Sequence, residues 1–304
     1  MEKDQVSLTA LMAAYQRGYH AEYDDPKIFN DFLAFYLLLP EERAAFGQQY
    51  RKIAEKYLPV STASNQDALQ FFIQNMSSTS DMISRARYTE DKLNEAVNSQ
   101  GVCQYVILGA GLDTFAFRHP KMVEKIQVFE VDHPATQISK RQRIASLEWS
   151  TPLNLHFIPV DFTKDKLETT LLRSSYNSNA TSFISWLGVT YYLPRNTVFA
   201  ALRTFATIAP AGSNIIFDYY DDAAFSLDKV APRMQGWKQY TKQAGEPIIT
   251  GFDPSTLARE LESIGLCIRE TLCPSDIEKR YFQGRLDNYH ATEHTHFVLA
   301  TIKE

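Results

Sequence analysis

The sequence has few cysteines, no surplus of basic charge and no long apolar run. Its three cysteines, Cys103, Cys267 and Cys273, cannot all pair and match no zinc-ligand spacing, so we expect reduced thiols. The net charge of -5 disfavours nucleic acid and anionic membranes as partners, because both bind through a basic face. No apolar run is long enough to span a bilayer, and the N-terminal stretch MEKDQVSLTA lacks the apolar core of a secretion signal. These absences predict a cytoplasmic protein that acts on a small molecule or a protein.

Linker-like segments are absent as well. No Ser/Gly-rich or Pro-rich run divides the 304 residues, so we expect one enlarged domain, and a hydrophobic content of 44% allows a large core. We find no internal repeat, and the sequence carries no signal of oligomeric state.

The chain divides into a helical part and an alternating part. Residues 1–98 are predicted to form a helical cap or lid, because segments such as DFLAFYLLLPEERAAF (31–46) and DALQFFIQNM (67–76) carry apolar residues at three-and-four spacing. In residues 99–304, short β-rich runs alternate with helical stretches, which predicts a mostly parallel, doubly wound α/β sheet. Insertions at about 221–252 and 274–293 interrupt this alternation and are candidates for a lid. The seven predicted strands are 104–108, 126–131, 155–160, 181–187, 213–220, 266–273 and 294–302.

A glycine turn follows the first predicted strand, in VILGAGLDTF. Gly109 and Gly111, with Ala110 between them, would let a ligand approach the backbone closely. Asp132 follows the next strand, 21 positions after Gly111, where an acid can hold a ribose diol. Together these features predict a cofactor that contains adenosine.

The residues after the turn help to choose that cofactor. Thr114 stands where nicotinamide-binding turns carry a third glycine, and Asp113 would lie at a helix start, where it would repel a pyrophosphate. S-adenosylmethionine carries two positive groups against one carboxylate and tolerates such an acid. Asp113 alone is also explained as a helix N-cap.

Three motifs, LGAGLDTFAFRHP, VFEVDHPATQISKRQRI and SWLGVTYYLP, resemble those of the leucine carboxyl methyltransferase family. The similarity is greatest to its bacterial branch of O-methyltransferases for small molecules, some in polyketide biosynthesis. The resemblance implies a class I methyltransferase fold, a last strand antiparallel to the others, and S-adenosylmethionine as cofactor.

The resemblance also implies roles for individual residues. Arg87 would bind the cofactor carboxylate, with Arg85 as the alternative. Leu187 stands where family members often have an acid, which leaves any role of that acid vacant. The remaining implied contacts are Gly109 and Gly111 at the methionine moiety, Asp132 with nearby Glu130 at the ribose, Asp161 and Phe162 at the adenine, and Trp186 and Tyr191 as aromatic walls.

Several other residues are candidates for the substrate side. Arg285 could clamp a carboxylate and His290 could accept a proton from a hydroxyl. Tyr191 and Tyr192 follow a strand end and could line the substrate site. Asp218 either faces the same crevice or caps the following turn. The group Glu293, His294 and His296 suggests zinc, but methyl transfer needs no metal and we predict none.

These features predict an S-adenosylmethionine-dependent O-methyltransferase for a carboxylate or hydroxyl of a small molecule. Three alternatives remain open: methylation of a protein C-terminal carboxylate, a nicotinamide-dependent oxidoreductase, and a cofactor-binding regulator without catalysis. A carboxylate acceptor is ionised at neutral pH and needs no base, whereas a phenol, with a pKa of about 10, benefits from one.

Overall fold

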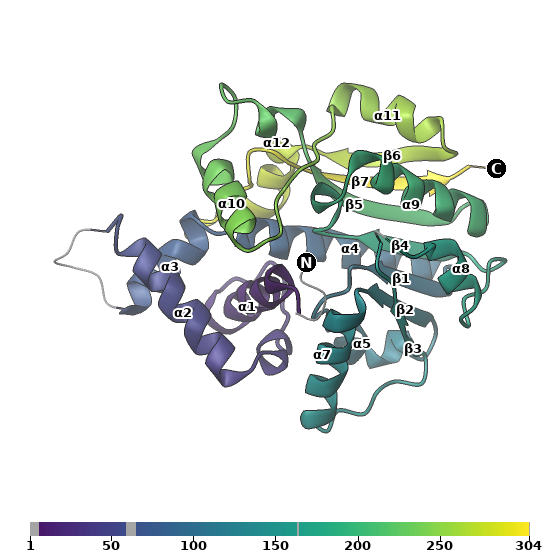
Figure 1. The fold of residues 1–304 in the computed structure, drawn as a ribbon, viewed down its shortest axis with the longest axis horizontal. Coiled ribbons are helices and arrows are strands. Elements are labelled where there is room, and N and C mark those ends of the chain that lie inside the picture. Colours follow the sequence, from purple (N-terminus) through teal and green to yellow (C-terminus); the bar gives the residue numbers. More distant parts are fainter. Residues whose placement is uncertain (1–5, 59–64, 163, 304) are drawn as a thin grey trace.

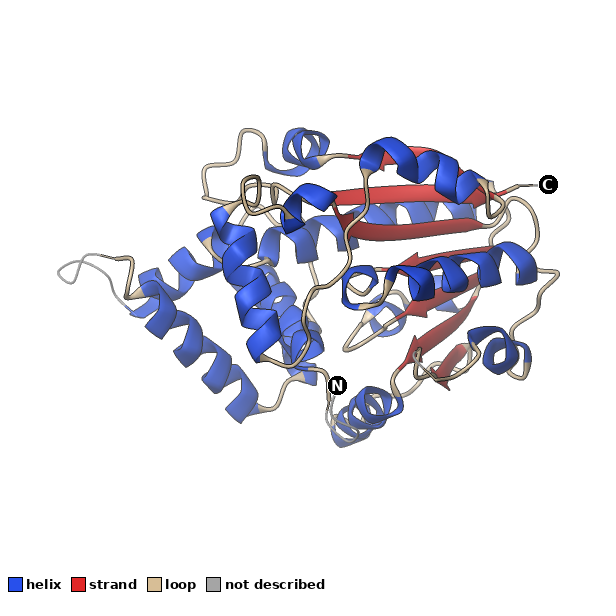
Figure 2. Ribbon diagram, turned by 45° about the horizontal axis from the view of Figure 1, so that its top comes forward, coloured by secondary structure: helices blue, strands red, loops and turns tan. Residues whose placement is uncertain are grey.

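The computed structural model describes residues 6–58, 65–162 and 164–303 and shows one seven-stranded sheet with helices on both faces (Figures 1 and 2). The strand order is β3-β2-β1-β4-β5-β7-β6; the first five are parallel, and β7 is antiparallel to both β5 and β6. The predicted strands are confirmed within one residue at each end. The strands are β1 (Gln104–Leu108), β2 (Gln127–Asp132), β3 (Leu155–Pro159), β4 (Ser182–Trp186), β5 (Asn214–Tyr220), β6 (Leu266–Leu272) and β7 (Thr295–Ile302).

Helices precede the sheet and connect its strands. The N-terminal ones are α1 (Leu8–Tyr23), η1 (Ala34–Leu37), α2 (Pro40–Ala54), α3 (Asn65–Asn75) and α4 (Thr79–Ser99). Residues 1–5 and 59–64 of the predicted helical part lie outside the described residues. The later helices are α5 (Phe115–Arg118), α6 (Pro120–Val123), α7 (Pro134–Ser146), α8 (Leu167–Leu172), η2 (Thr190–Tyr192), α9 (Arg195–Ile208), η3 (Asp222–Phe225), α10 (Pro232–Gln243), α11 (Pro254–Glu262), α12 (Pro274–Ile277) and η4 (Glu278–Phe282).

The helical spacing over residues 31–46 covers two separate helical elements, η1 and the first part of α2. A short 3-10 turn, η1, comes first, and Leu39 is extended with φ -66° and ψ 149° before α2 begins at Pro40. Proline disfavours a helical conformation in the residue before it and suits the first turn of a new helix. The apolar spacing is therefore helical on both sides of a break that Pro40 imposes.

Both faces of the sheet are buried, and alternate residues of β1 point to opposite sides. Tyr105 and Ile107 join a core shared with the N-terminal helices, whereas Val106 and Leu108 join a core shared with α9 and α11. The N-terminal helices thus complete one face of the sheet. The three cysteines are free thiols, as expected, and no helix in the described ranges is both long and apolar enough to cross a membrane.

Candidate functional site

A cavity of about 420 Å³ lies at the carboxyl ends of the parallel strands. This is the edge at which open α/β sheets bind ligands. The N-terminal helices and the insertion after β5 complete its wall. Its lining includes 107–113 at and after the end of β1, Asp132 and His133 at and after the end of β2, 160–162 after β3, 187–189 and 191–193 after β4, Ala10, Ala13 and Arg17 of α1, Met82, Arg85 and Glu90 of α4, and 245–247 after α10.

The glycine turn packs closely against Val189 and Ala10. Gly109 has φ +64° and Gly111 has φ +52°, both in the left-handed region that favours glycine. A Cβ atom on Gly109 would overlap Val189 Cγ2, and one on Gly111 would lie 3.1 Å from Ala10 Cβ. Both glycines are therefore required by conformation and by close approach of the chain.

Asp132 lines the cavity beside this turn. One carboxylate oxygen accepts from the N–H of His133 over 2.6 Å, and the other accepts from the N–H of Gly111. Burial raises the pKa of this carboxyl, and the Gly111 bond offsets part of the rise. A carboxylate has about four lone-pair positions, so Asp132 can still accept from two ligand hydroxyls.

Glu130 is a core residue and lies outside the lining of the cavity, which corrects its expected place near a ribose. It is 1% exposed, and its carboxylate pairs with Lys140 of α7 over 2.5 Å. Burial raises the pKa of Glu130 to about 7, and Lys140 opposes that rise. Glu130 and Asp132 are two positions apart on β2, so their side chains lie on the same face of the sheet. Asp132 is the last residue of β2 and reaches the carboxyl edge, whereas Glu130 stays within the core.

Asp113 lines the cavity. Its carboxylate accepts from the N–H of Phe115 over 2.7 Å at the start of α5, but Thr114 holds the N-cap position, which corrects the expectation that Asp113 is the N-cap.

The β3 end supplies Asp161 and Phe162, and both line the cavity. Asp161 pairs with Lys164 and lies 3.8 Å from His133. Trp186 is fully buried behind Phe162, with ring centroids 6.1 Å apart, so its expected role as a cavity wall is wrong. It belongs to the core on the α9 face of the sheet, and Leu187 reaches the cavity instead.

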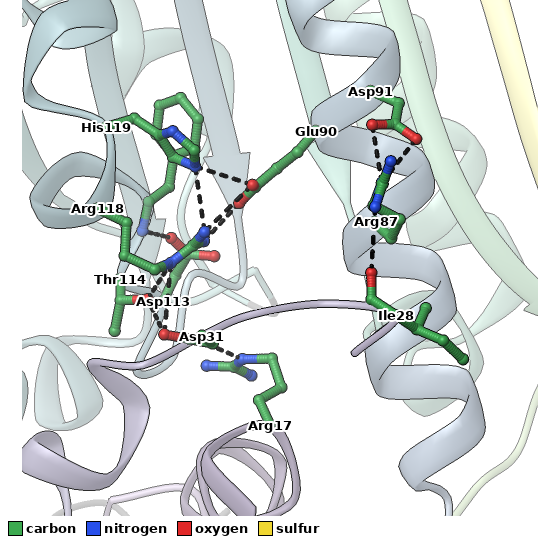
Figure 3. Close-up of polar contacts among 11 residues, drawn as sticks. Arg17, Ile28, Asp31, Arg87, Glu90, Asp91, Asp113, Thr114, Arg118 and His119 are labelled. Carbon is green, nitrogen blue, oxygen red and sulfur yellow. Dashed lines mark hydrogen bonds and ion pairs between the residues drawn. The ribbon is translucent and has the colours of Figure 1, made fainter. Parts of the chain in front are cut away.

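The expected cofactor arginine, Arg87, points away from the cavity. Its side chain is 50% exposed, pairs with Asp91 over 2.9 Å and donates to the Ile28 carbonyl over 3.4 Å (Figure 3). Arg85, the alternative, is 8% exposed and lines the cavity. Residues two apart on a helix face different directions, so only one of the two can point inward.

Arg85 belongs to a buried network at the ends of β4 and β5. Its Nη1 donates to Asp218 Oδ2 over 2.8 Å and to the Tyr191 hydroxyl oxygen over 3.1 Å. The other Asp218 oxygen accepts from the N–H of Gly188 over 2.6 Å. Burial raises the pKa of Tyr191 to about 12, against the opposing effect of Arg85. Tyr191 lines the cavity as predicted.

Sequence analysis missed Arg17. Its Nη2 donates to the Leu112 carbonyl of the glycine turn over 2.9 Å. Its Nε donates to Asp31 over 2.9 Å (Figure 3). Arg118 lies between Asp31 and Glu90, which links α1 to α4 through one charged cluster (Figure 3). No local pattern marks Arg17, because its partners are far away in the sequence.

Arg285 and His290 lie outside the cavity lining, which corrects their expected substrate role. Arg285 pairs with Asp287 over 2.5 Å and donates to the Pro26 carbonyl, and His290 is 70% exposed beside Glu278. The hydroxyl of Tyr289 donates to Asp24 over 2.8 Å and draws this segment against the turn after α1.

His294 and His296, just before and within β7, hold the turn after β5 through Asp221. His294 and His296 both contact the Asp221 carboxylate, over 2.8 and 3.2 Å, and His294 Nε2 also accepts from the N–H of Ala231. Glu293 is exposed. Within the described ranges, no group of three His, Cys, Asp or Glu side chains is placed to hold a metal ion.

Comparison with known proteins identifies relatives of the whole chain. The model of the family described as leucine carboxyl methyltransferase matches residues 10–206. YktD of Bacillus subtilis, whose name places it among S-adenosyl-L-methionine-dependent methyltransferases, is 36% identical over all of both chains. A Mycobacterium tuberculosis protein of the same description is 27% identical over 82% of this chain and 74% of its own.

Solved structures resemble the fold at low sequence identity. A Thermobifida fusca protein named as a methyltransferase gives a TM-score of 0.61 at 13% identity, over 100% of this chain and 97% of its own. A Streptomyces avermitilis protein gives 0.59 at 12% identity, over 96% and 97%. The fold is that of the class I methyltransferases, as the sequence predicts.

Proposed function

The chain belongs to the leucine carboxyl methyltransferase family, and from that premise we propose an S-adenosylmethionine-dependent O-methyltransferase for a carboxylate or hydroxyl of a small molecule. The carboxylate is the acceptor that the site favours. The observation that carries this proposal is the cavity that joins the glycine turn and Asp132 to the buried pair Arg85 and Tyr191.

The cavity offers suitable groups for each part of S-adenosylmethionine. Phe162 and Asp161 would border the adenine, and Asp132 would accept from the ribose hydroxyls. The glycine turn would let the methionine part approach the backbone. Arg85, in place of Arg87, would bind the carboxylate, with Arg17 on the α1 side of the same cavity.

The bound cofactor supplies a methyl group on a positively charged sulfur, which a nucleophilic oxygen attacks in line. The chain aligns that oxygen and excludes water, which together lower the barrier. Residues of α1 and 245–247 border the cavity and serve the second purpose. Asp113, in the lining, favours a cationic ligand electrostatically, whereas the charge of Glu90 is balanced by Arg118.

Tyr191 favours a carboxylate acceptor. Its raised pKa, about 12, keeps the hydroxyl protonated at neutral pH, so it acts as a donor and not as a base. Arg85 donates to its oxygen, which leaves the Tyr191 hydrogen available to an acceptor oxygen. A carboxylate needs only donors, whereas a phenol also needs a base, and His290, predicted for that task, lies elsewhere.

The alternatives receive less support. A protein C-terminus needs access for a chain, and residues of α1 and 245–247 line the cavity on the side away from the sheet. Membership of a methyltransferase family argues against the nicotinamide-dependent oxidoreductase. A regulator without catalysis stays an alternative because Leu187 borders the cavity where relatives often have an acid. Cytoplasmic location and a role in polyketide synthesis stay predictions.

Methyl transfer from labelled S-adenosylmethionine tests the proposal. Small carboxylic acids, phenols and a peptide ending in leucine are offered as acceptors, and each product is treated with mild alkali. Methyl esters release labelled methanol, whereas aryl ethers keep the label. We expect alkali-labile label on small acids. Label on the peptide alone would favour the protein substrate, and cofactor binding without any transfer would favour the regulator.

A further inference from the structure

We propose that Asp218 is a positioning residue that fixes Arg85 for the cofactor carboxylate. This inference rests on the proposed function, because it assumes that the cavity binds S-adenosylmethionine. Asp218 is 1% exposed and lies outside the cavity lining, so it would act on the ligand only through Arg85.

The two oxygens of Asp218 have different partners. Oδ1 accepts from the N–H of Gly188, in the loop after β4, and Oδ2 accepts from Arg85 on α4. The backbone of Asp218 is held in the sheet, where it pairs with Phe297 of β7. A carboxylate with one oxygen bound to fixed backbone cannot rotate freely, so the second oxygen sets the direction of the guanidinium.

Gly188 shapes the other side of Arg85. It has φ +72°, and a Cβ atom there would overlap Arg85 Nη2. The guanidinium is therefore flat against the loop, with Nη1 turned to Asp218 and Tyr191. Arginine has five N–H donors in a rigid plane, and the bonds to Asp218, Tyr191 and Met82 use three of them, which leaves two for a ligand in the cavity.

The alternative role of Asp218, capping the turn after β5, belongs to another residue. Asp221 Oδ1 accepts from the N–H of Ala224 at the start of η3. The carboxylate of Asp218 is thus committed to Gly188 and Arg85. In the same cavity, Arg17 is oriented by Asp31 on the α1 side.

Two ligands separate this role from general damage to the site. S-adenosylhomocysteine carries the amino-acid carboxylate, whereas 5′-methylthioadenosine has the same adenosine and lacks it. For Asp218→Asn, which retains an oxygen for the Gly188 N–H, we expect about tenfold weaker binding of S-adenosylhomocysteine and unchanged binding of 5′-methylthioadenosine.

Glu130→Gln is the matched control. It removes the charge of another acid that is buried in an ion pair on the same sheet but lies outside the cavity lining. We expect the ratio of the two affinities to stay at the wild-type value. Arg85→Gln should lower S-adenosylhomocysteine affinity as Asp218→Asn does, and combining the two should change the ratio no further, since Asp218 acts through Arg85.

Thermal unfolding shows which variants fold. If Asp218→Asn does not fold, Asp218→Glu takes its place, because it keeps the charge but displaces the guanidinium by about one methylene. The affinity for S-adenosylhomocysteine relative to that for 5′-methylthioadenosine should still fall. A wild-type ratio in a folded Asp218 variant would overturn the inference, as would a further loss from Asp218→Asn in the Arg85→Gln background. If wild-type protein binds neither ligand, the proposed function fails instead.

Discussion

The backbone N–H of Thr9 donates to the Glu246 carboxylate over 3.2 Å, and this bond joins the first turn of α1 to the segment after α10. Both residues border the cavity. The first N–H groups of a helix have no partner within it, and an anion there is electrostatically favourable. Glu246 therefore both caps α1 and connects the two elements over the site.

Glu246→Ala should loosen the contact between α1 and residues 245–247, which together cover the cavity. We expect bound S-adenosylhomocysteine to dissociate about three- to tenfold faster, because a hydrogen bond to a charged group is lost. Stopped-flow displacement measures that rate. Glu246→Gln retains an acceptor oxygen for Thr9 and should stay near the wild-type rate. Equal rates in all three proteins would mean that the bond does not hold the cover closed.

Asp132→Ala tests the ribose contact. The fold should persist, while affinity for S-adenosylhomocysteine falls by roughly 1 to 3 kcal/mol, the cost of unpairing hydrogen bonds to a charged group. Calorimetry should show the same loss for 5′-methylthioadenosine, because both ligands contain the ribose. Unchanged affinity for both would place the ribose elsewhere.

Gly109→Ala tests whether the turn needs glycine for space as well as for conformation. The left-handed backbone alone costs about 1 to 2 kcal/mol in alanine, and overlap with Val189 should add about 1 to 3 kcal/mol. Gly101→Ala is the control, because Gly101 has φ +69° but no heavy atom among the described residues lies within 4 Å of the added Cβ. Urea unfolding compares the two. Equal losses would argue against the overlap.

Tyr191→Phe tests donation to the acceptor. We expect kcat/KM for the acceptor to fall about tenfold and S-adenosylhomocysteine affinity to fall by less, because Asp218 still holds Arg85 when its bond to Tyr191 is lost. Burial raises the pKa of Tyr191 to about 12, so its proton is lost only as pH rises towards that value. In wild-type protein, the rate should therefore show no loss as pH passes 10, the ordinary tyrosine pKa, about which a solvated phenol would titrate. A fall centred near pH 10 that Tyr191→Phe removes would contradict this role.

The strands and the glycine turn were predictable because their signals are local. Five parallel strands appear as short apolar runs; Gly109 directly follows one of them and Asp132 is the last residue of another. Side-chain direction was less predictable. Trp186 lies on a strand buried on both faces, so alternation does not show which side it takes. The choice between Arg85 and Arg87 depends on how α4 is rotated against the sheet, which only tertiary packing fixes.

Interactions between distant segments account for the other errors. Arg285 and His290 belong to a loop whose position depends on the hydrogen bond from Tyr289 to Asp24, 265 residues earlier in the chain. Arg17 reaches the site because α1 packs over the glycine turn, with Ala10 against Gly111. The local sequence of neither segment predicts these contacts.

The shared core of the N-terminal helices and the sheet limits how the protein can be shortened. Tyr88 of α4 stacks on Phe297 of β7 with ring centroids 5.7 Å apart, and Tyr105 and Phe183 belong to the same apolar cluster. A fragment that starts at residue 99 would leave this side of the sheet in water, and an apolar patch of that kind promotes aggregation. A reduced yield of soluble protein for such a fragment would then be explained by aggregation, without any effect on methyl transfer.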